Sequence, residues 1–164
     1  MSAQTGARSQ HGAKMAVPAP PASPRGCTNF KARQLARLLS RRYDAQLATV
    51  GLKTTQYSLL SHVLHGGPLA PGELARRMGL DASTLTRNMK PLLDAGWLLL
   101  EAGDDARSRS VRITAEGRAK QSEAKRRWKE AQQALNGHLG VQRVAALHAL
   151  IDECLELLGA ETVS

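Results

Sequence analysis

Residues 72–90 read GELARRMGLDASTLTRNMK, and the spacing of three small or aliphatic residues within them predicts the fold. Ala75 has almost no side chain, so a second helix can approach the first closely. Gly79, four residues later, tolerates the left-handed backbone conformation with which many helices end. Leu85 would then fill the wedge between the two helices. This spacing is typical of a helix-turn-helix.

The predicted second helix has one apolar and one polar face, and Asp81 or Ser83 can cap its first turn. Apolar residues recur at steps of three and four, so they share the inward faces of both helices: Leu74, Met78, Leu85, Met89, Leu92 and Leu93. The outward face would carry only hydrogen-bonding groups: Ser83, Thr84, Thr86, Arg87, Asn88 and Lys90. Such groups suit base edges and phosphates. The alternative is an ordinary solvated face.

A basic hairpin is predicted directly after these two helices. Residues 97–101, WLLLE, form a short apolar run, and residues 111–114 alternate between apolar and polar. The loop between the two strands, residues 103–110, reads GDDARSRS. The order of two helices, strand, basic loop and strand predicts a winged helix.

The loop places Arg107 and Arg109 near its tip, where Asp104 or Asp105 can orient one of them through a charge-assisted contact. An arginine held out on such a loop can enter the minor groove of DNA, where the potential is most negative. A solvated charged turn is the alternative for the loop alone. The basic loop and the polar helix face together make double-stranded DNA the leading partner.

At this point the chain resembles the MarR family, the multiple antibiotic resistance regulators. The resemblance runs from about Cys27 to the C-terminus and rests on YDAQLATVGLKTTQYSLLSHV from Tyr43, GELARRMGLDASTLTRNMKPLLDAGWL from Gly72 and DARSRSVRITAEG from Asp105. It implies a mainly α, homodimeric winged-helix regulator of transcription, usually a repressor, on a pseudo-palindromic operator. The family's DNA-contacting roles map onto Ser83, Thr84, Thr86, Arg87 and Lys90 in the recognition helix and onto Arg107 and Arg109 in the wing, where Asp105 takes the orienting role.

The chain divides by composition into a tail and one domain. Residues 1–26 are rich in Ala, Pro, Ser and Gly and carry only basic charges, which predicts a disordered tail. We interpret residues 27–164 as a single domain. Within it, residues 54–114 form the winged helix-turn-helix, and residues 27–50 and 115–164 form dimerisation helices. Thr114 can cap the helix that follows the wing, Gly137 is expected to end it, and Gly140 to open the last one.

The predicted last helix has an apolar seam in which residues alternate by three and four: Val144, Leu147, Ile151, Leu155 and Leu158. Without a partner such a helix exposes an apolar patch, so a homodimer is expected.

The formal net charge of +9 favours an anionic partner such as nucleic acid. No run of about twenty apolar residues suggests a membrane span, and no apolar stretch fits a secretory signal, so a cytoplasmic location is expected.

The resembled regulators commonly release DNA on binding small aromatic or phenolic anions in a crevice between the dimer helices and the winged head. Residues on elements that could line such a crevice are Tyr57, His62, His65 and Trp128. His62 and His65 are three residues apart without further ligands, so no metal site is predicted. A solvated helix end is their simplest alternative.

Thiol oxidation is an alternative release signal. Cys27 stands just before the first predicted helix, where helix amides can favour the thiolate, and some members of the resembled family sense peroxide through a cysteine in that helix. Cys154 falls within the apolar seam, where an inert core position is the simpler interpretation. A bond between Cys27 and the Cys154 of another subunit is the geometry to consider.

No enzyme is predicted, because the chain contains no phosphate-binding glycine loop, nucleophile elbow or Cys and His cluster. No cofactor is expected either. The second class of function is a protein-interaction module, since a winged helix can bind protein with the same face. Salt dependence separates the two, because DNA binding weakens steeply as salt rises.

Overall fold

The computed structural model describes residues 23–102 and 109–160. The predicted tail, residues 1–26, lies almost wholly outside this part of the chain, and so do Asp105 and Arg107 of the predicted wing loop. The described residues form two compact units, one over residues 26–138 and one that contains the C-terminal helix. No described helix is both long enough and apolar enough to cross a membrane.

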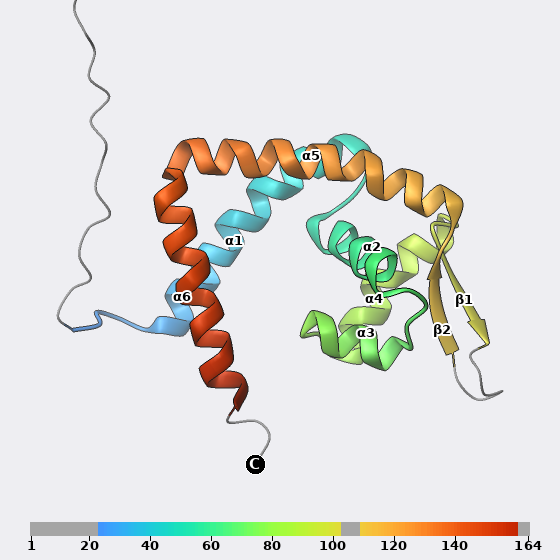
Figure 1. The fold of residues 1–164 in the computed structure, drawn as a ribbon, viewed down its shortest axis with the longest axis horizontal. Coiled ribbons are helices and arrows are strands. Elements are labelled where there is room, and N and C mark those ends of the chain that lie inside the picture. Colours follow the sequence, from blue (N-terminus) through green and yellow to red (C-terminus); the bar gives the residue numbers. More distant parts are fainter. Residues whose placement is uncertain (1–22, 103–108, 161–164) are drawn as a thin grey trace, which may run out of the picture. The chain divides into compact units, whose positions relative to one another are not determined.

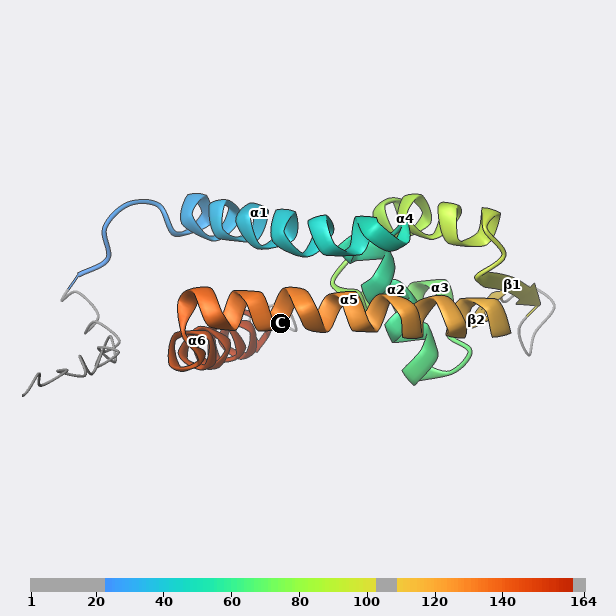
Figure 2. The ribbon, with the colours of Figure 1, turned by 90° about the horizontal axis from the view of Figure 1, so that it is seen from above.

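The first unit contains five helices and a hairpin among its described residues (Figure 1). In chain order these are α1 (Thr28–Leu47), a short 3-10 turn (Ala48–Val50), α2 (Thr54–Gly66), α3 (Pro71–Met78), α4 (Ala82–Asp94), β1 (Leu98–Ala102), β2 (Arg109–Ile113) and α5 (Ala115–Leu139). Helix α2 is central, because it packs against α1, α3, α4 and β2. The hairpin follows α4 at one end of this unit (Figure 2).

The turn between α3 and α4 has the geometry that its sequence predicts. Helix α3 begins at Pro71, whose missing N–H has no intrahelical partner in the first turn of a helix. It ends at Gly79, which has a φ of 62°, and the amide of Leu80 donates to the carbonyl of Ala75 at 2.9 Å. The left-handed glycine therefore closes α3 and directs the chain into α4.

The core of the first unit is apolar and holds α3 and α4 together. Leu74, Leu85 and Leu92 are almost completely buried, and Met89 is buried beside them. Met78 and Leu93 are partly buried against the same cluster. The inward face predicted for the two helices is confirmed. Helix α4 runs through Pro91 to Asp94, because the proline stands late in the helix and its apolar neighbours remain packed.

The hairpin pairs β1 and β2 in antiparallel register, from Leu98 opposite Ile113 to Ala102 opposite Arg109. Arg109 is thus the first residue of β2, and the prediction that it lies near the loop tip is wrong. The strand starts two residues earlier than the alternation of apolar residues indicated, because the backbone pairing extends beyond the last inward side chain. The loop between α2 and α3 adds a bridge to this sheet, in which Leu69 and Val111 exchange backbone hydrogen bonds of 2.8 and 3.2 Å.

Helix α5 begins where its cap predicts, but it ends later than predicted. The amide of Gly117 donates to the Oγ1 of Thr114 at 2.9 Å, which confirms the cap. The helix continues through Gly137 to Leu139, so the predicted end at Gly137 is wrong. A glycine can remain helical, and the left-handed conformation occurs instead at Gly140, with a φ of 85°.

The second unit is dominated by α6 (Val141–Ala160). The carbonyl of Gly140 accepts hydrogen bonds from the amides of Arg143 and Val144, so Gly140 opens this helix as predicted. Val144 is buried, whereas every residue from Ala149 to Gly159 is exposed.

Two glycines of α5 give a matched test of how the start of α5 packs against Trp97. A Cβ on Gly117 would lie 2.0 Å from the carbonyl oxygen of Trp97, whereas one on Gly137 would have nothing within 4 Å. We expect Gly117→Ala to lower the free energy of unfolding by about 1–3 kcal/mol through overpacking. Gly137→Ala should raise it by about 0.5–1 kcal/mol, because alanine is the better helix former. Urea unfolding followed by circular dichroism, at one fixed protein concentration, measures both, and equal effects would contradict the packing described.

Candidate nucleic-acid interface

The first turn of α4 is fixed by Asp81. Its Oδ1 accepts from the Oγ of Ser83 at 2.6 Å and from the amide of Thr84 at 2.7 Å, and its Oδ2 accepts from the Oγ1 of Thr84 at 2.8 Å. The hydrogen bond from the Ser83 hydroxyl, followed by those from Thr84, holds the pKa of Asp81 well below its usual range. The carboxylate therefore stays ionised beside the positive end of the helix.

These bonds also decide what the two hydroxyls can offer to a partner. While Ser83 and Thr84 donate to Asp81, their oxygen atoms present only lone pairs. Thr86 is in the same condition, since its Oγ1 donates to the carbonyl of Ala82 at 2.8 Å. Such acceptors match the amino groups of adenine and cytosine in the major groove better than they match phosphate oxygens.

The remaining three residues of the predicted face differ in exposure and in whether they have a partner within the described chain. Arg87 is exposed and has no hydrogen-bond or ion-pair partner within the described residues. Lys90 is exposed, but its Nζ lies 2.9 Å from the Oδ2 of Asp94. Asn88 is half-buried and lines a cavity. Arg87 is therefore the cation on this face of α4 that is most available to a polyanion.

Two arginines of the wing, both on β2, lie in the described part of the chain. Arg109 is exposed at the start of β2, on the strand that follows the loop. Further along β2, Arg112 pairs with Glu101 of β1 at 2.9 Å, so its charge is balanced across the strands. The predicted orienting role of Asp105 and the groove contact of Arg107 fall on residues outside the described part of the chain.

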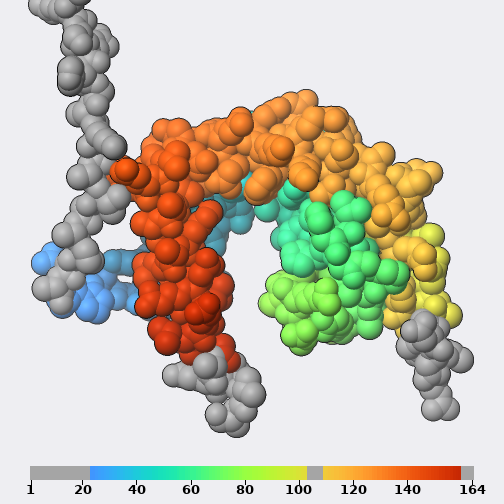
Figure 3. Space-filling model, viewed as in Figure 1, coloured from blue at the N-terminus to red at the C-terminus, as the bar shows by residue number. Residues whose placement is uncertain are grey.

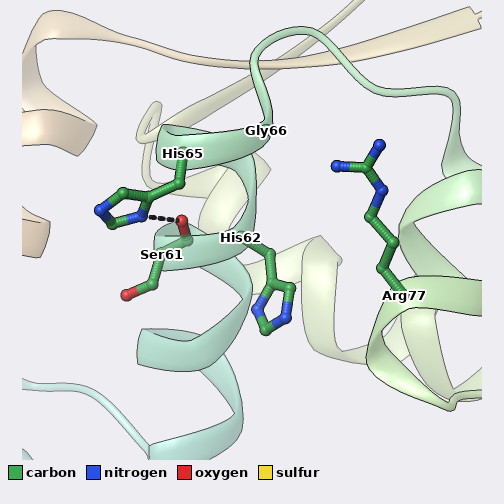
Figure 4. Close-up of a pocket in the computed structure, with 5 residues that line it drawn as sticks. All are labelled: Ser61, His62, His65, Gly66 and Arg77. Atoms are coloured by element: carbon green, nitrogen blue, oxygen red, sulfur yellow. Dashed lines mark hydrogen bonds between the residues drawn. The ribbon is translucent and has the colours of Figure 1, made fainter.

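The four residues predicted to line an effector crevice fall into two groups. Tyr57 is buried and stacks on the partly buried Trp128, with ring centroids 6.1 Å apart. Burial raises the pKa of Tyr57, partly offset by a hydrogen bond with Ser61. His62 and His65 instead line a different place, a cavity of about 310 Å³ shared with Arg77 (Figure 4).

A further crevice, which sequence reasoning missed, lies between α1, α2 and the end of α3. It has a volume of about 480 Å³ and is lined by Ser40, Asp44, Lys53, Thr54, Thr55, Ser58, Met78, Leu80 and Asn88. Asp44 holds its walls together, because its Oδ1 accepts from the amide and the hydroxyl of Thr54 at 2.7 and 2.6 Å. An adjoining cavity of about 350 Å³ shares Ser40 and Asp44 and adds Ala36, Arg37 and Arg41.

The one sequence signal for this crevice was the start of α2. The amide of Thr54, in the first turn of α2, has no acceptor within the helix, and Asp44 supplies one. The partner, Asp44, stands ten residues earlier, beyond a turn at Gly51 that has a φ of 72°. No local spacing rule connects residues so far apart.

Both cysteines are free and exposed. Cys27 directly precedes α1, and its side chain makes no cap hydrogen bond. Cys154 lies on the exposed part of α6 and is not part of a core in the single chain. The two thiols belong to different units, and their pairing stays a prediction.

Taken together, a capped polar helix, a left-handed glycine turn and a two-stranded wing define a winged helix-turn-helix. A model of the MarR family matches residues 50–108. The chain is 33% identical over 90 residues to the "Uncharacterized HTH-type transcriptional regulator YwoH" of Bacillus subtilis, over 55% of this chain and 66% of that protein.

Solved structures agree with this similarity. The fold is similar to that of the M. tuberculosis transcriptional regulator MosR, with a TM-score of 0.68 and 31% identity over 81% of this chain and 98% of that one. A structure of MosR in complex with DNA has a TM-score of 0.64 and 33% identity, over 79% and 98% of the two chains. The chain belongs to the MarR family, which is a family of transcription regulators rather than enzymes.

Proposed function

We propose that the protein is a homodimeric repressor that binds a pseudo-palindromic DNA operator and releases it when a small aromatic anion binds. The observation that carries the DNA part is the outward face of α4. That face is fixed by the Asp81 cap and presents Arg87 without a partner in the described chain. The DNA complex of MosR supports the same assignment in a chain of 33% identity.

Each residue of the predicted interface then has a role. Arg87 and Lys90 would meet phosphates or guanine edges, and the hydroxyls of Ser83, Thr84 and Thr86 would accept from base amino groups. Asn88 reaches the edge of the face from its half-buried position. In the wing, Arg107 would reach the minor groove with Asp105 orienting it, and the exposed Arg109 at the start of β2 would contact the DNA beside it.

Replacing Arg87 tests the DNA contact. We expect Arg87→Ala to weaken operator binding by about 1–3 kcal/mol and to reduce the slope of log affinity against log salt by about one if the side chain meets a phosphate. Fluorescence anisotropy on an operator selected from genomic fragments measures both. Arg126→Ala, an exposed arginine in the middle of α5, is the matched control and should change neither. A salt-independent affinity would favour the protein-interaction module instead.

The dimer is supported by the surface of α6, drawn in red in Figure 3. Large apolar side chains remain exposed on this helix, with exposed fractions from 41% to 67%: Val141, Leu150, Ile151, Leu155, Leu157 and Leu158. An apolar surface of this kind is costly in water unless a partner covers it. A second copy of the chain would supply an identical seam, and a symmetric dimer would place two recognition helices about 34 Å apart, one turn of DNA.

Charge placed in the seam should separate the subunits. We expect Leu155→Arg to shift the protein toward monomer in sedimentation equilibrium, raising the dimer dissociation constant at least about tenfold, because a cation would be buried in an apolar contact. Leu99→Arg on β1 is the control, since Leu99 is exposed on an element outside α6. Unchanged association in the Leu155 variant would remove α6 from the interface.

The effector part rests on the crevice around Asp44. Lys53 gives it a cation, Thr55 and Ser58 give it hydroxyls, and Met78 and Leu80 give it apolar walls, which together suit an aromatic carboxylate. Asn88 carries one wall on α4, so a bound ligand would touch the helix that we assign to DNA. Oxidation of Cys27 or Cys154 is the lesser alternative for release.

Salicylate serves as a probe of the crevice. We expect it to lower operator affinity in the unmodified protein, and Lys53→Ala to raise the half-effective concentration about fivefold through loss of one exposed charge contact. Lys129→Ala, on the exposed face of α5, is the control. If salicylate has no effect while peroxide releases the operator, with Cys27→Ser abolishing that release, oxidation is the signal.

A further inference from the structure

The cavity between the end of α2 and α3 has a basic lining that the proposed DNA face and effector crevice do not use. It measures about 310 Å³ and is lined by Ser61, His62, His65, Gly66 and Arg77. Figure 4 shows the His62 ring on the side of α2 that faces Arg77 and the guanidinium of Arg77 near Gly66 at the end of α2, whereas the His65 ring points away from Arg77. Arg77 and His62 therefore line one small space from α3 and from α2.

Glu73 fixes the direction of the Arg77 guanidinium. The Nε of Arg77 donates to the Oε1 of Glu73 at 2.6 Å, and the Nη1 and Nη2 have no partner in the part of the chain that the structure describes. The same carboxylate also accepts two hydrogen bonds from Arg76, at 2.8 and 2.9 Å. Bonds from Arg76 and then Arg77 lower the pKa of Glu73 to about 2, so it carries a full charge near neutral pH.

One carboxylate cannot neutralise two guanidinium groups. Glu73 balances one positive charge of the pair Arg76 and Arg77, and a net charge of about +1 remains at this end of α3. The side chain of Arg76 is 74% exposed and absent from the cavity lining, whereas Arg77 is 43% exposed and lines it. Its two free η nitrogens form a fork suited to two oxygen atoms of one anion.

The residue at position 66 is suited to this arrangement. A Cβ on Gly66 would lie 2.9 Å from the Nη1 of Arg77 and 2.8 Å from the Cδ1 of Leu69. Because both distances are shorter than side-chain contacts allow, a larger residue at position 66 would displace the guanidinium. Glycine lets it rest against the end of α2.

His62 completes the lining with a ring whose outer nitrogen is unused. Its Nδ1 lies 2.8 Å from the carbonyl oxygen of Ser58. A carbonyl oxygen only accepts, so Nδ1 carries the hydrogen and Nε2 has no partner among the described residues. Protonation at Nε2 makes the ring a cation and a donor. The described chain offers no set of three acidic, histidine or cysteine ligands for a metal ion, and the neighbouring guanidinium disfavours a cation.

We propose that this cavity is an oxyanion site. Arg77 binds two oxygen atoms of a phosphate-like or carboxylate anion, and His62 makes a third contact with the same anion. A bound anion would tie α2 to α3, the first helix of the helix-turn-helix. The anion has two possible sources, a free small oxyanion or a backbone phosphate of DNA. The site does not depend on the proposed effector crevice, because the two cavities have no lining residue in common.

Inorganic phosphate is the probe for the free anion. It is titrated into the full chain without DNA, at constant ionic strength, while NMR follows the Gly66 amide and the His62 ring. We expect saturable shifts of both, with an affinity at least about tenfold weaker in Arg77→Gln, since a charge-assisted fork is lost. His62→Gln should also weaken it. Arg76→Gln is the matched control, with the same charge change and the same Glu73 partner, and should retain the affinity.

Gly66→Ala keeps every charge and should also weaken phosphate binding; if this variant fails to fold, the charge variants still decide the test. For the DNA source, the salt slope of operator binding is compared in Arg77→Gln and Arg76→Gln. A slope reduced by about one in Arg77→Gln alone, with no phosphate shifts, assigns the site to a DNA phosphate. The proposal is overturned if phosphate shifts are absent, or equal in both arginine variants, and the salt slopes also agree. Because the phosphate titration contains no DNA, its result is distinct from failure of the proposed operator binding.

Discussion

The orientation of α4 depends on the apolar contact that it makes with α3, where Leu74 and the small Ala75 of α3 share one buried cluster with Leu85 of α4. An aliphatic wedge of this kind has no directional bonds, so its geometry follows from close packing and from the turn that joins the two helices. Gly79 supplies that turn with a single left-handed residue. The position of the contact face on α4 is therefore set by the packing of this small cluster.

Apolar packing sets the position of α4, and hydrogen bonds then fix the directions of its polar side chains. Asp81 engages both hydroxyls of the first turn of α4, and Thr86 bonds back to its own helix, so three of the six polar side chains are already oriented. Arg87 is left without such a partner in the described chain. The face therefore combines preset acceptors with Arg87, which is unpaired among the described residues, and with Lys90, which pairs with Asp94. Preset groups lose little rotamer freedom on binding, which favours selectivity over bulk attraction.

Local signals in the sequence predicted the features that depend on neighbouring residues. The Gly79 turn, the Asp81 cap and the Thr114 cap each join residues within a few positions, so their spacing was enough. Leu85 and Leu92 were identified as core by helical periodicity. The last turn of α5 was missed because Gly137 and Gly140 are equal as residue types, so the residue type alone does not decide which one leaves the helix.

Contacts between distant residues were beyond such reasoning. Asp44 capping Thr54, Arg77 resting against Gly66 and Leu69 pairing with Val111 each require the fold to bring separate elements together. Tyr57 and Trp128 were named because they stand on elements that could line an effector crevice of the resembled family, and their contact with each other was not foreseen. The two rings stack, with Tyr57 buried and Trp128 partly buried, and such aromatic pairs stabilise a core beyond the area they bury.

The bridge between Leu69 and Val111 makes the sheet three-stranded at one point and gives the hairpin a second anchor. Side chains alternate between the faces of a strand, so a residue inserted next to Val111 would exchange the inward and outward sets of β2. Arg112 would then turn inward and the apolar side chains would turn to water. Evolution can therefore change the length of this hairpin at its open end but not at its base, where the chain is held on both sides.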